Sequence, residues 1–189
     1  RYENICKYVH LPVQSGSSEM LGRMNRGYTR EWYIDRLNSI RRIMPDCGIS
    51  TDIITGFCGE TEEEHNETVS LMKWAGYDFA YMFAYSERPK TMAERQFKDD
   101  VPEDVKKKRL QEIIVIQQEN SAITTKARVG KVHRVLVEQT SKKDETKWKG
   151  RNSQNTVVVF PKENFKPGDY VDVMVTSCTV ATLIGEAVK

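Results

Sequence analysis

Two side chains near the N-terminus have the chemistry and the spacing to bind a charged small molecule. Residues 9–16 run from a largely apolar segment through Pro12 into Gln14, which indicates a buried strand ending in a polar turn. The amide of Gln14 can both donate and accept hydrogen bonds at that strand end. Arg26 follows at the far end of a predicted helix, where its guanidinium can pair with a carboxylate. In barrels of strands and helices, ligands bind at this end of the strands.

A second group of side chains, close to the C-terminus, combines cations with an aromatic ring: Lys147, Trp148, Lys149, Arg151 and Asn155. Single-stranded or looped RNA is bound by such a combination, because cations neutralise phosphates and aromatic faces stack on bases. Trp148 has an alternative interpretation as a core residue. The pattern predicts an RNA-binding surface whose affinity falls steeply with salt.

The elements that position the first group alternate between strands and helices. Strands are predicted at residues 5–13, 49–54 and 79–85, and helices at residues 18–24, 30–44, 62–75 and 103–125. This alternation is typical of βα units with a parallel sheet. Three strands cannot close a barrel, so we expect an earlier part of the sheet to precede Arg1. The basic run at residues 106–109 is interpreted as a solvated helix face.

The character of the sequence changes near Thr125. Five short strands are predicted at residues 132–137, 147–149, 156–160, 170–175 and 182–184, which is typical of a small Greek-key barrel that binds oligonucleotides. The predicted fold class is therefore α/β: a partial (β/α) barrel over residues 1–125, then a five-stranded OB-like barrel over residues 126–189. The first part has 17 Lys and Arg against 20 Asp and Glu, and the second has 12 against 7, which predicts an anionic partner for the second.

The overall composition excludes several classes of protein. The chain has 189 residues, 30% of them charged, and a net charge of +2, as in an ordinary folded protein. It has no apolar run of about 18 residues and no signal peptide, so we expect a cytoplasmic protein with no membrane partner. The four cysteines lack the CxxC or CxxxCxxC spacing of metal sites, and the three histidines are too scattered to share a metal. We interpret His10 as a structural histidine.

Several motifs occur together in the order of one known family. Residues 10–16 read HLPVQSG, residues 24–26 MNR, residues 52–61 DIITGFCGET and residues 85–89 YSERP. In this order they resemble the second half of the radical SAM domain of the methylthiotransferases. Residues 126–189 resemble the TRAM domain of that family, including Val137-Glu138, Gly150-Arg151-Asn152 with Asn155, and Leu183-Ile184-Gly185. Cys58 stands where the family usually has Pro, and we interpret it as a tolerated small residue.

The segment HLPVQSG is similar to that of the MiaB branch, which modifies tRNA. This resemblance implies methylthiolation of isopentenyladenosine (dimethylallyladenosine) next to the anticodon, with the chain as the C-terminal portion of the enzyme. Branches that act on threonylcarbamoyladenosine in tRNA or on a ribosomal protein are alternatives within the family. Outside it, the alternatives are a stand-alone RNA-binding module and a different small-molecule barrel enzyme with an RNA-binding tail.

The resemblance also implies roles for individual residues. Gln14 and Asp52 would bind the ribose hydroxyls of S-adenosyl-L-methionine (SAM), and Arg26 would bind its carboxylate. Ser86 and Arg88, after the last strand of the partial barrel, would meet the tRNA near the modified base. The residues expected to bind tRNA on the second domain are Lys149, Arg151 and Asn155. The structural alternatives are a satisfied turn for Gln14, a surface ion pair for Arg26 and a loop cap for Asp52.

The resemblance further implies the cofactors. Radical SAM enzymes hold SAM on the open iron of a [4Fe–4S] cluster and cleave it to a deoxyadenosyl radical. We therefore expect SAM and [4Fe–4S] clusters, with the ligating cysteines upstream of Arg1, and we expect the chain alone to be catalytically inactive. The expected partners are the anticodon stem-loop of tRNA, an electron donor and a sulfur source, of which the last two have no signature in the sequence.

Overall fold

The computed structural model describes residues 4–188 and divides into two compact units. His10–Pro45 and Ser50–Asn120 form the first, named here the strand–helix unit. Ser121–Lys189, with Arg1–Val9 and Asp46–Ile49, form the second, named the barrel unit, within the described range. The predicted domain boundary near Thr125 falls inside a helix, Glu103–Lys126, and stays a prediction.

The strand–helix unit contains most of a sheet of strand order β1-β2-β3; the strands are Tyr8–His10, Gly48–Thr55 and Phe79–Ala84, of which residues 8–9 and 48–49 are assigned to the barrel unit. β2 and β3 pair in parallel, with Asp52 beside Tyr81, as the alternation of strands and helices predicts. β1 is shorter than the predicted strand at residues 5–13. Pro12 has no N–H to donate, and the chain rejoins the sheet only at a single parallel bridge between Gln14 and Ile53.

The described residues contain five helices: α1 Ser18–Arg23, α2 Arg30–Ile43, α3 Glu62–Ala75, α4 Met92–Gln96 and α5 Glu103–Lys126. The side chains of Ser17, Thr29 and Thr61 cap the first three. Thr61 and Glu64 complete the predicted capping box, which satisfies two backbone donors at the start of α3. The sequence does not predict α4, because its five residues are too few to show a helical period.

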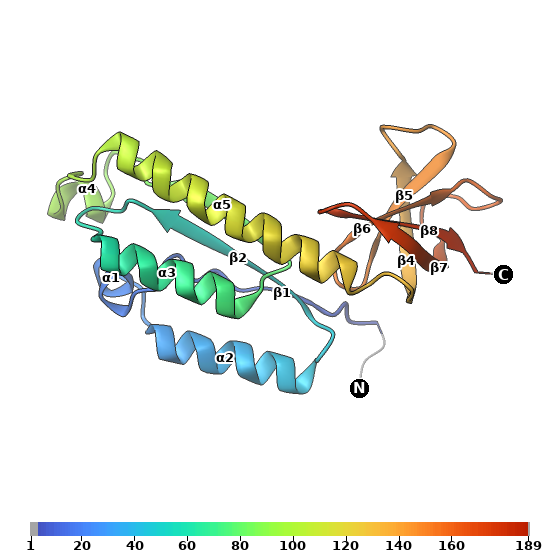
Figure 1. Cartoon of the computed structure of the whole chain (residues 1–189), viewed down its shortest axis with the longest axis horizontal. Helices are drawn as coiled ribbons and strands as arrows, with labels where there is room; N and C mark the ends of the chain where they lie inside the picture. Colours follow the sequence, from blue (N-terminus) through green and yellow to red (C-terminus); the bar gives the residue numbers. More distant parts are fainter. Residues whose placement is uncertain (1–3, 189) are drawn as a thin grey trace. The chain divides into compact units, whose positions relative to one another are not determined.

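The helices α2, α3 and α5 run alongside the strands of the sheet (Figure 1). Tyr33 and Leu37 of α2 and Ile53 of β2 are at most 1% exposed, so this face of the sheet is packed. Alternate residues of β3 point the other way: Phe79, Tyr81 and Phe83 are about half exposed. The second face of the sheet is therefore open, and it is the face that carries His10, whose ring packs edge-on against that of Tyr81.

Five strands of the barrel unit close into a barrel in the order β4-β5-β6-β8-β7, which confirms the predicted five-stranded barrel (Figure 1). The strands are Val132–Thr140, Lys147–Asn152, Val157–Pro161, Tyr170–Cys178 and Thr182–Ala187, for β4 to β8 in chain order. Inward-facing residues form the core: Val135, Val137, Val158, Phe160, Val171, Val173, Val175 and Leu183. The residues between them on each strand face outward.

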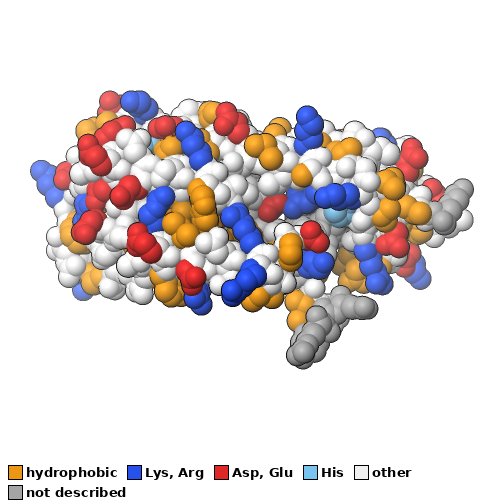
Figure 2. All heavy atoms as spheres, turned by 60° about the horizontal axis from the view of Figure 1, so that its bottom comes forward, with side chains coloured by type: hydrophobic (Ala, Val, Ile, Leu, Met, Phe, Trp, Pro, Cys, Tyr) orange, Lys and Arg blue, Asp and Glu red, His pale blue; other side chains and the backbone are white. Residues whose placement is uncertain are grey.

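The structure contradicts one prediction about charged residues, the one made for residues 106–109. Basic and acidic side chains are intermixed over the strand–helix unit (Figure 2). The interpretation of residues 106–109 as a solvated face is wrong for two of the four, because Lys106 is 1% and Arg109 6% exposed. Both lie on the helical stripe of α5 that continues through Ile113 into the core. Among residues 4–188, no helix has the length and hydropathy needed to cross a membrane.

Candidate functional site

Gln14 is fixed against the end of β2. Its N–H donates to the Asp52 carbonyl (2.9 Å), and its own carbonyl accepts from the N–H of Ile54 (2.9 Å). Its backbone is left-handed (φ 71°), a conformation that costs free energy for any residue except glycine and persists where the surroundings enforce it. Gln14, which follows β1, is therefore paired with β2 next to Asp52, which lies within that strand.

Helices α2 and α3 hold the turn that follows Gln14. The N–H of Gly16 donates to Oγ1 of Thr68 (2.9 Å), and Arg30 donates to the Gly16 carbonyl (2.8 Å). A Cβ atom on Gly16 would lie 2.5 Å from Cα of Thr68, so only glycine fits this approach. The Ser-Gly that follows Gln14 thus docks the turn onto the helices and positions Gln14.

Asp52 lies on the open face of the sheet and contacts His10. Nε2 of His10 is 3.4 Å from Oδ1 of Asp52, and Nδ1 is 2.8 Å from Oγ of Ser50. Both ring nitrogens have partners, which agrees with the structural role predicted for His10. The Asp52 side chain is 29% exposed, so its carboxylate remains accessible to the hydroxyl groups of a ligand.

A pocket of about 270 Å³, named here the Arg26 pocket, lies where the chain leaves α1 and β2. Its polar lining is Arg23, Asn25 and Arg26, and its apolar lining is Met24, Ile54, Phe57, Tyr85, Met92, Ala93 and Phe97. Arg23 is engaged, because it donates to the Gly59 carbonyl (2.8 Å) and pairs with Glu64. Within residues 4–188, Arg26 makes no ion pair, and the lining of its pocket does not include Gln14 or Asp52. Its guanidinium is the cation that this pocket can offer to an anionic ligand.

The Tyr85 hydroxyl supplies a second polar group to the Arg26 pocket. It is buried and bonds to no nitrogen or oxygen atom among the described residues; the weakly polar Cys58 thiol lies beside it. Burial, and then the neighbouring Cys58 thiol, raise the pKa of Tyr85 to about 12. The phenol therefore keeps its proton at neutral pH and can donate it to a ligand.

Of the two buried cations of α5, Arg109 holds the loop between β2 and α3. Arg109 donates to the carboxylate and to the carbonyl of Glu60 (both 2.9 Å), and the same carboxylate accepts the Gly56 N–H (2.7 Å). Burial raises the pKa of Glu60, although Gly56 and Arg109 act in the opposite direction. Lys106 pairs with two carboxylates, Asp99 (2.7 Å) and Glu103 (3.1 Å). Because the loop carries Phe57, α5 positions one wall of the Arg26 pocket.

Ser86 and Arg88 follow Tyr85 directly and are exposed. The carbonyl of Arg88 accepts a hydrogen bond from the Thr91 hydroxyl (2.8 Å), which fixes the turn before α4. Ser86 is next in sequence to Tyr85, which lines the Arg26 pocket, and Arg88 is two residues further on. Their predicted role in meeting tRNA stays a prediction.

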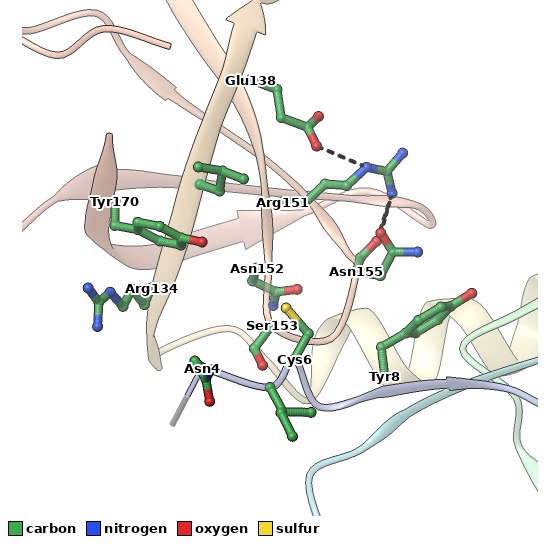
Figure 3. Close-up of a pocket in the computed structure, with 12 residues that line it drawn as sticks. Asn4, Cys6, Tyr8, Arg134, Glu138, Arg151, Asn152, Ser153, Asn155 and Tyr170 are labelled. Atoms are coloured by element: carbon green, nitrogen blue, oxygen red, sulfur yellow. Dashed lines mark hydrogen bonds and ion pairs between the residues drawn. The ribbon is translucent and has the colours of Figure 1, made fainter. Parts of the chain in front are cut away.

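A larger cavity of about 630 Å³ lies in the barrel unit, on the outward face of the barrel strands (Figure 3). We name it the outer cavity; it is lined by Asn4, Ile5, Cys6, Tyr8, Arg134, Leu136, Glu138, Arg151, Asn152, Ser153, Asn155 and Tyr170. Two predicted RNA-binding residues meet here, because Arg151 donates to the carbonyl (2.9 Å) and to Oδ1 (3.0 Å) of Asn155. The structure thus brings Arg151 and Asn155 together in one concave site.

Lys149 and Trp148 do not line the outer cavity. Lys149 is half-buried on β5, opposite Gln139 of β4 and Val159 of β6. Trp148 packs against the barrel core, with the ammonium of Lys162 4.5 Å from its ring centroid. The structure therefore supports the alternative interpretation of Trp148 as a core residue. The role of Lys149 stays a prediction.

Sequence reasoning missed Tyr170 and Arg134, which lie at one end of the outer cavity. A signal for Tyr170 exists in β7: Val171, Val173 and Val175 alternate inward, so Tyr170 must face outward. For Lys106 and Arg109 the signal is their three-residue spacing on the same helical stripe as the apolar residues of α5. No local pattern indicates that the Tyr85 hydroxyl bonds to no nitrogen or oxygen atom among the described residues.

The fold and the two sites define a class of protein, and comparisons with known proteins agree with it. Residues 2–72 match the model of the Radical SAM superfamily, and residues 126–188 match that of the TRAM domain. A solved structure of coproporphyrinogen III oxidase (HemN) from Escherichia coli, a radical SAM enzyme, shares the fold with a TM-score of 0.52 and 19% identity. That likeness covers 78% of this chain and 41% of the HemN chain. The chain is thus a radical SAM protein that carries a TRAM domain.

Curated relatives that share one name match nearly the whole chain. A tRNA-2-methylthio-N(6)-dimethylallyladenosine synthase from Amoebophilus asiaticus is 58% identical over 98% of this chain, and the match covers 38% of that relative. Relatives with the same name from Christiangramia forsetii and Bacteroides fragilis are 54% and 53% identical over 99% and 98% of the chain, matching 39% and 40% of their own lengths. Over nearly its whole length the chain is similar to these synthases, and it spans about two fifths of the length of the curated relatives it matches.

The radical SAM family uses SAM together with an iron–sulfur cluster, and the described residues fit the first but not the second. The Arg26 pocket combines an apolar wall, a cation and the Tyr85 hydroxyl, which suits a carboxylate beside an apolar group, and its volume of about 270 Å³ suits part of a SAM molecule. By contrast, no group of three or more His, Cys, Asp or Glu within residues 4–188 could hold a metal ion. All four cysteines are free thiols.

Proposed function

We propose that this chain is part of a tRNA methylthiotransferase that converts N6-dimethylallyladenosine to its 2-methylthio derivative. The observation that carries the proposal is the 58% identity over 98% of the chain to a synthase named for that product. The match runs through both the radical SAM region and the TRAM domain, so it covers the parts that would bind the cofactor and the RNA. The modified adenosine would be the one next to the anticodon.

The strand–helix unit would bind SAM, which supplies the radical chemistry when it is held on an iron–sulfur cluster. Arg26 would pair with the carboxylate of SAM, and the apolar wall of the Arg26 pocket would exclude water from it. Gln14 and Asp52, which lie next to each other, would accept and donate hydrogen bonds to ribose hydroxyls. A rigid hold on these groups favours reaction, because it fixes the reacting atoms in one orientation.

The barrel unit would bind the tRNA substrate. Twelve Lys and Arg stand against seven Asp and Glu in residues 126–189, so this part attracts phosphate. Arg151 and Asn155 lie together in the outer cavity, and Lys149 is on the neighbouring part of β5. Ser86 and Arg88, which follow the wall of the Arg26 pocket, would contact the tRNA near the modified base.

The test replaces the matching two fifths of the Bacteroides fragilis relative with this chain. The chimera and the unchanged relative are reconstituted with iron and sulfide without oxygen, then incubated with SAM and dimethylallylated tRNA. The tRNA is digested and analysed by mass spectrometry. We expect 2-methylthio-dimethylallyladenosine from both proteins, and none from a chimera in which Arg26 and Asp52 are both replaced by Ala.

Other outcomes separate the alternatives. A product on threonylcarbamoylated tRNA or on a ribosomal protein, but not on dimethylallylated tRNA, would move the chain to another branch of the family. If the relative is active and the chimera has no product on any substrate, the proposed enzymatic function is wrong and an RNA-binding module becomes the better assignment.

A further inference from the structure

The outer cavity has the size and the walls of a ligand site. Its volume, about 630 Å³, lies inside the range of pockets that bury small ligands. Outward-facing residues of β4, β5 and β7 form one side, and the segment 4–8 forms the other (Figure 3). The segment is attached to the barrel by a hydrogen bond from the Lys7 N–H to Oγ of Ser153 (2.8 Å).

One end of the outer cavity presents an aromatic ring beside a cation. Tyr170 is 62% exposed, although the strand that carries it supplies three valines to the core. The Arg134 guanidinium lies 4.9 Å from the Tyr170 ring centroid, and within residues 4–188 it makes no ion pair. Figure 3 shows the Tyr170 hydroxyl pointing toward the centre of the space. An exposed ring braced by a guanidinium is a stacking surface for a nucleobase.

The other end presents a second guanidinium that is already oriented. Arg151 is held by Asn155 and by Glu138, whose Oε1 is 3.5 Å from Nε (Figure 3). The left-handed backbone of Asn155 (φ 62°) keeps its carbonyl and its side chain on the same arginine. The charged residues of the lining are two arginines and one glutamate, so the cavity favours a ligand with a single negative charge. One phosphodiester group has that charge.

Between these ends the lining is apolar with polar edges. Leu136 and Ile5 offer contact area, while Ser153 and Asn4 offer hydroxyl and amide groups at the base of the cavity (Figure 3). Asn152 is 5% exposed and is used by the fold, because its Oδ1 accepts from two backbone N–H groups of the following turn. Asn152 is therefore fixed in position within the lining of the cavity.

We propose that the outer cavity binds one unpaired nucleotide of an RNA, with the base stacked on Tyr170 beside Arg134 and the phosphate near Arg151. The proposal rests on the RNA-binding part of the proposed function and adds a defined site for a single base. A base inside a duplex cannot reach Tyr170, because both of its faces are covered by neighbouring pairs. The site therefore selects tRNA segments in which a nucleotide is splayed out, such as an anticodon loop.

The experiment measures binding of a short single-stranded RNA that carries one 2-aminopurine, whose fluorescence falls when it stacks. Tyr170→Leu removes the ring and keeps an apolar side chain, and Tyr170→Phe restores the ring. Met174→Ala is the matched control: it changes an outward residue of the same strand that does not line the cavity. Circular dichroism confirms that each variant is folded.

We expect Tyr170→Leu to weaken binding by roughly tenfold or more and to abolish the quenching, since base stacking on an aromatic residue is worth that much. Tyr170→Phe and Met174→Ala should bind like the wild type. The same RNA annealed to its complement should bind weakly and without dependence on Tyr170. Arg134→Gln should weaken single-strand binding and make it less sensitive to salt.

Three results would overturn the proposal, and each has a different consequence for the RNA-binding part of the proposed function. If RNA binds and Tyr170→Leu changes nothing, the cavity proposal fails while RNA binding by the barrel stands. If neither single-stranded nor duplex RNA binds, the RNA-binding part of the proposed function fails as well. If adenosine monophosphate binds with Tyr170 dependence and the oligonucleotide does not, the cavity is a site for a free nucleotide.

Discussion

Arg23 and Arg26 are three residues apart, yet the structure gives them different tasks. Arg23 donates to the Gly59 carbonyl and pairs with Glu64 at the start of α3, so it ties two loops together. Arg26 lines the same pocket without an ion pair in the described part of the chain. A surface ion pair was the structural alternative for Arg26, and no residue within residues 4–188 forms an ion pair with it. The guanidinium of Arg26 is therefore available for a ligand carboxylate.

Arg26→Ala should weaken SAM binding without affecting RNA binding. A charge-assisted hydrogen bond is worth about 1.5–3 kcal/mol, so we expect a loss of about 10- to 150-fold in affinity. Calorimetric titration of SAM into the cluster-loaded chimera measures it, with Arg42→Ala, an exposed arginine on α2, as the control. If SAM and RNA affinities fall together, Arg26 acts through the fold and not on SAM.

Gly56 is the residue on which the β2–α3 loop depends for its shape. Its φ is +69°, and a Cβ atom there would lie 2.4 Å from Cγ of Lys106. Gly56→Ala should cost about 2–5 kcal/mol of unfolding free energy, combining the left-handed backbone with overpacking. Gly22→Ala is the control: that glycine is inside α1 with nothing within 4 Å of the added Cβ, and alanine should stabilise the helix by up to about 1 kcal/mol. Urea unfolding compares the two, and equal effects would refute this account of Gly56.

At the scale of elements, α5 shows what local sequence can and cannot predict. Its range follows from Pro102 and from apolar periodicity, and the observed helix is one residue longer than the predicted one. The environment of its charges does not follow, because the carboxylate that neutralises Arg109 is Glu60, 49 residues away in sequence. A basic run is solvated by default. The partner of Arg109 lies in the loop after β2, which only the tertiary fold brings near, whereas Lys106 pairs with Asp99 and Glu103, which precede it closely in sequence.

The Gln14–Asp52 site and the outer cavity also differ in how far the sequence predicts them. The neighbouring positions of Gln14 and Asp52 follow from two strand-end motifs in consecutive βα units, so the sequence predicts them. The outer cavity joins the segment 4–8 to residues of three barrel strands as far as Tyr170. No single segment of the sequence predicts this cavity. The local pattern favours Trp148 as the aromatic residue that binds RNA, but Trp148 packs against the barrel core.

In the barrel, His133 of β4 is coupled to the turn after β5. Nδ2 of Asn152 is 3.2 Å from Nδ1 of His133, and Oδ1 of Asn152 already accepts two backbone N–H groups. Nδ1 must therefore accept the hydrogen bond, which requires a neutral ring. Burial, and then the nearby Arg128, lower the pKa of His133 from its usual 6.5. Neutral His133 therefore makes its full contribution to the unfolding free energy above pH 6.5.

Acidification should destabilise the barrel through His133. Below pH 6.5 the unfolded chain binds a proton on this histidine more readily than the folded chain does, so the unfolding free energy falls as pH drops. Urea unfolding of the wild type and of His133→Gln at pH 8 and pH 5.5 measures the difference. We expect a smaller pH dependence in the variant, and an identical one would show that His133 is protonated equally in both states.

At the scale of the whole molecule, charge is divided between the two kinds of site. Residues 1–125 have 17 Lys and Arg against 20 Asp and Glu, and two of their cations, Arg23 and Arg109, are paired with Glu64 and Glu60. Residues 126–189 have 12 against 7, and the excess is free to meet phosphate. Affinity for RNA should therefore come mainly from the barrel unit.

This division predicts how salt affects RNA binding. For single strands, the logarithm of the binding constant falls with the logarithm of salt concentration by about 0.7 per phosphate contact. Arg151→Gln should reduce the magnitude of that slope by about 0.7, because it removes one oriented guanidinium. Lys107→Gln changes an exposed cation of α5 and should leave the slope unchanged. Titrations of one RNA at four salt concentrations give both slopes. Equal slopes for the two variants would mean that net charge, and not the outer face of the barrel, determines affinity.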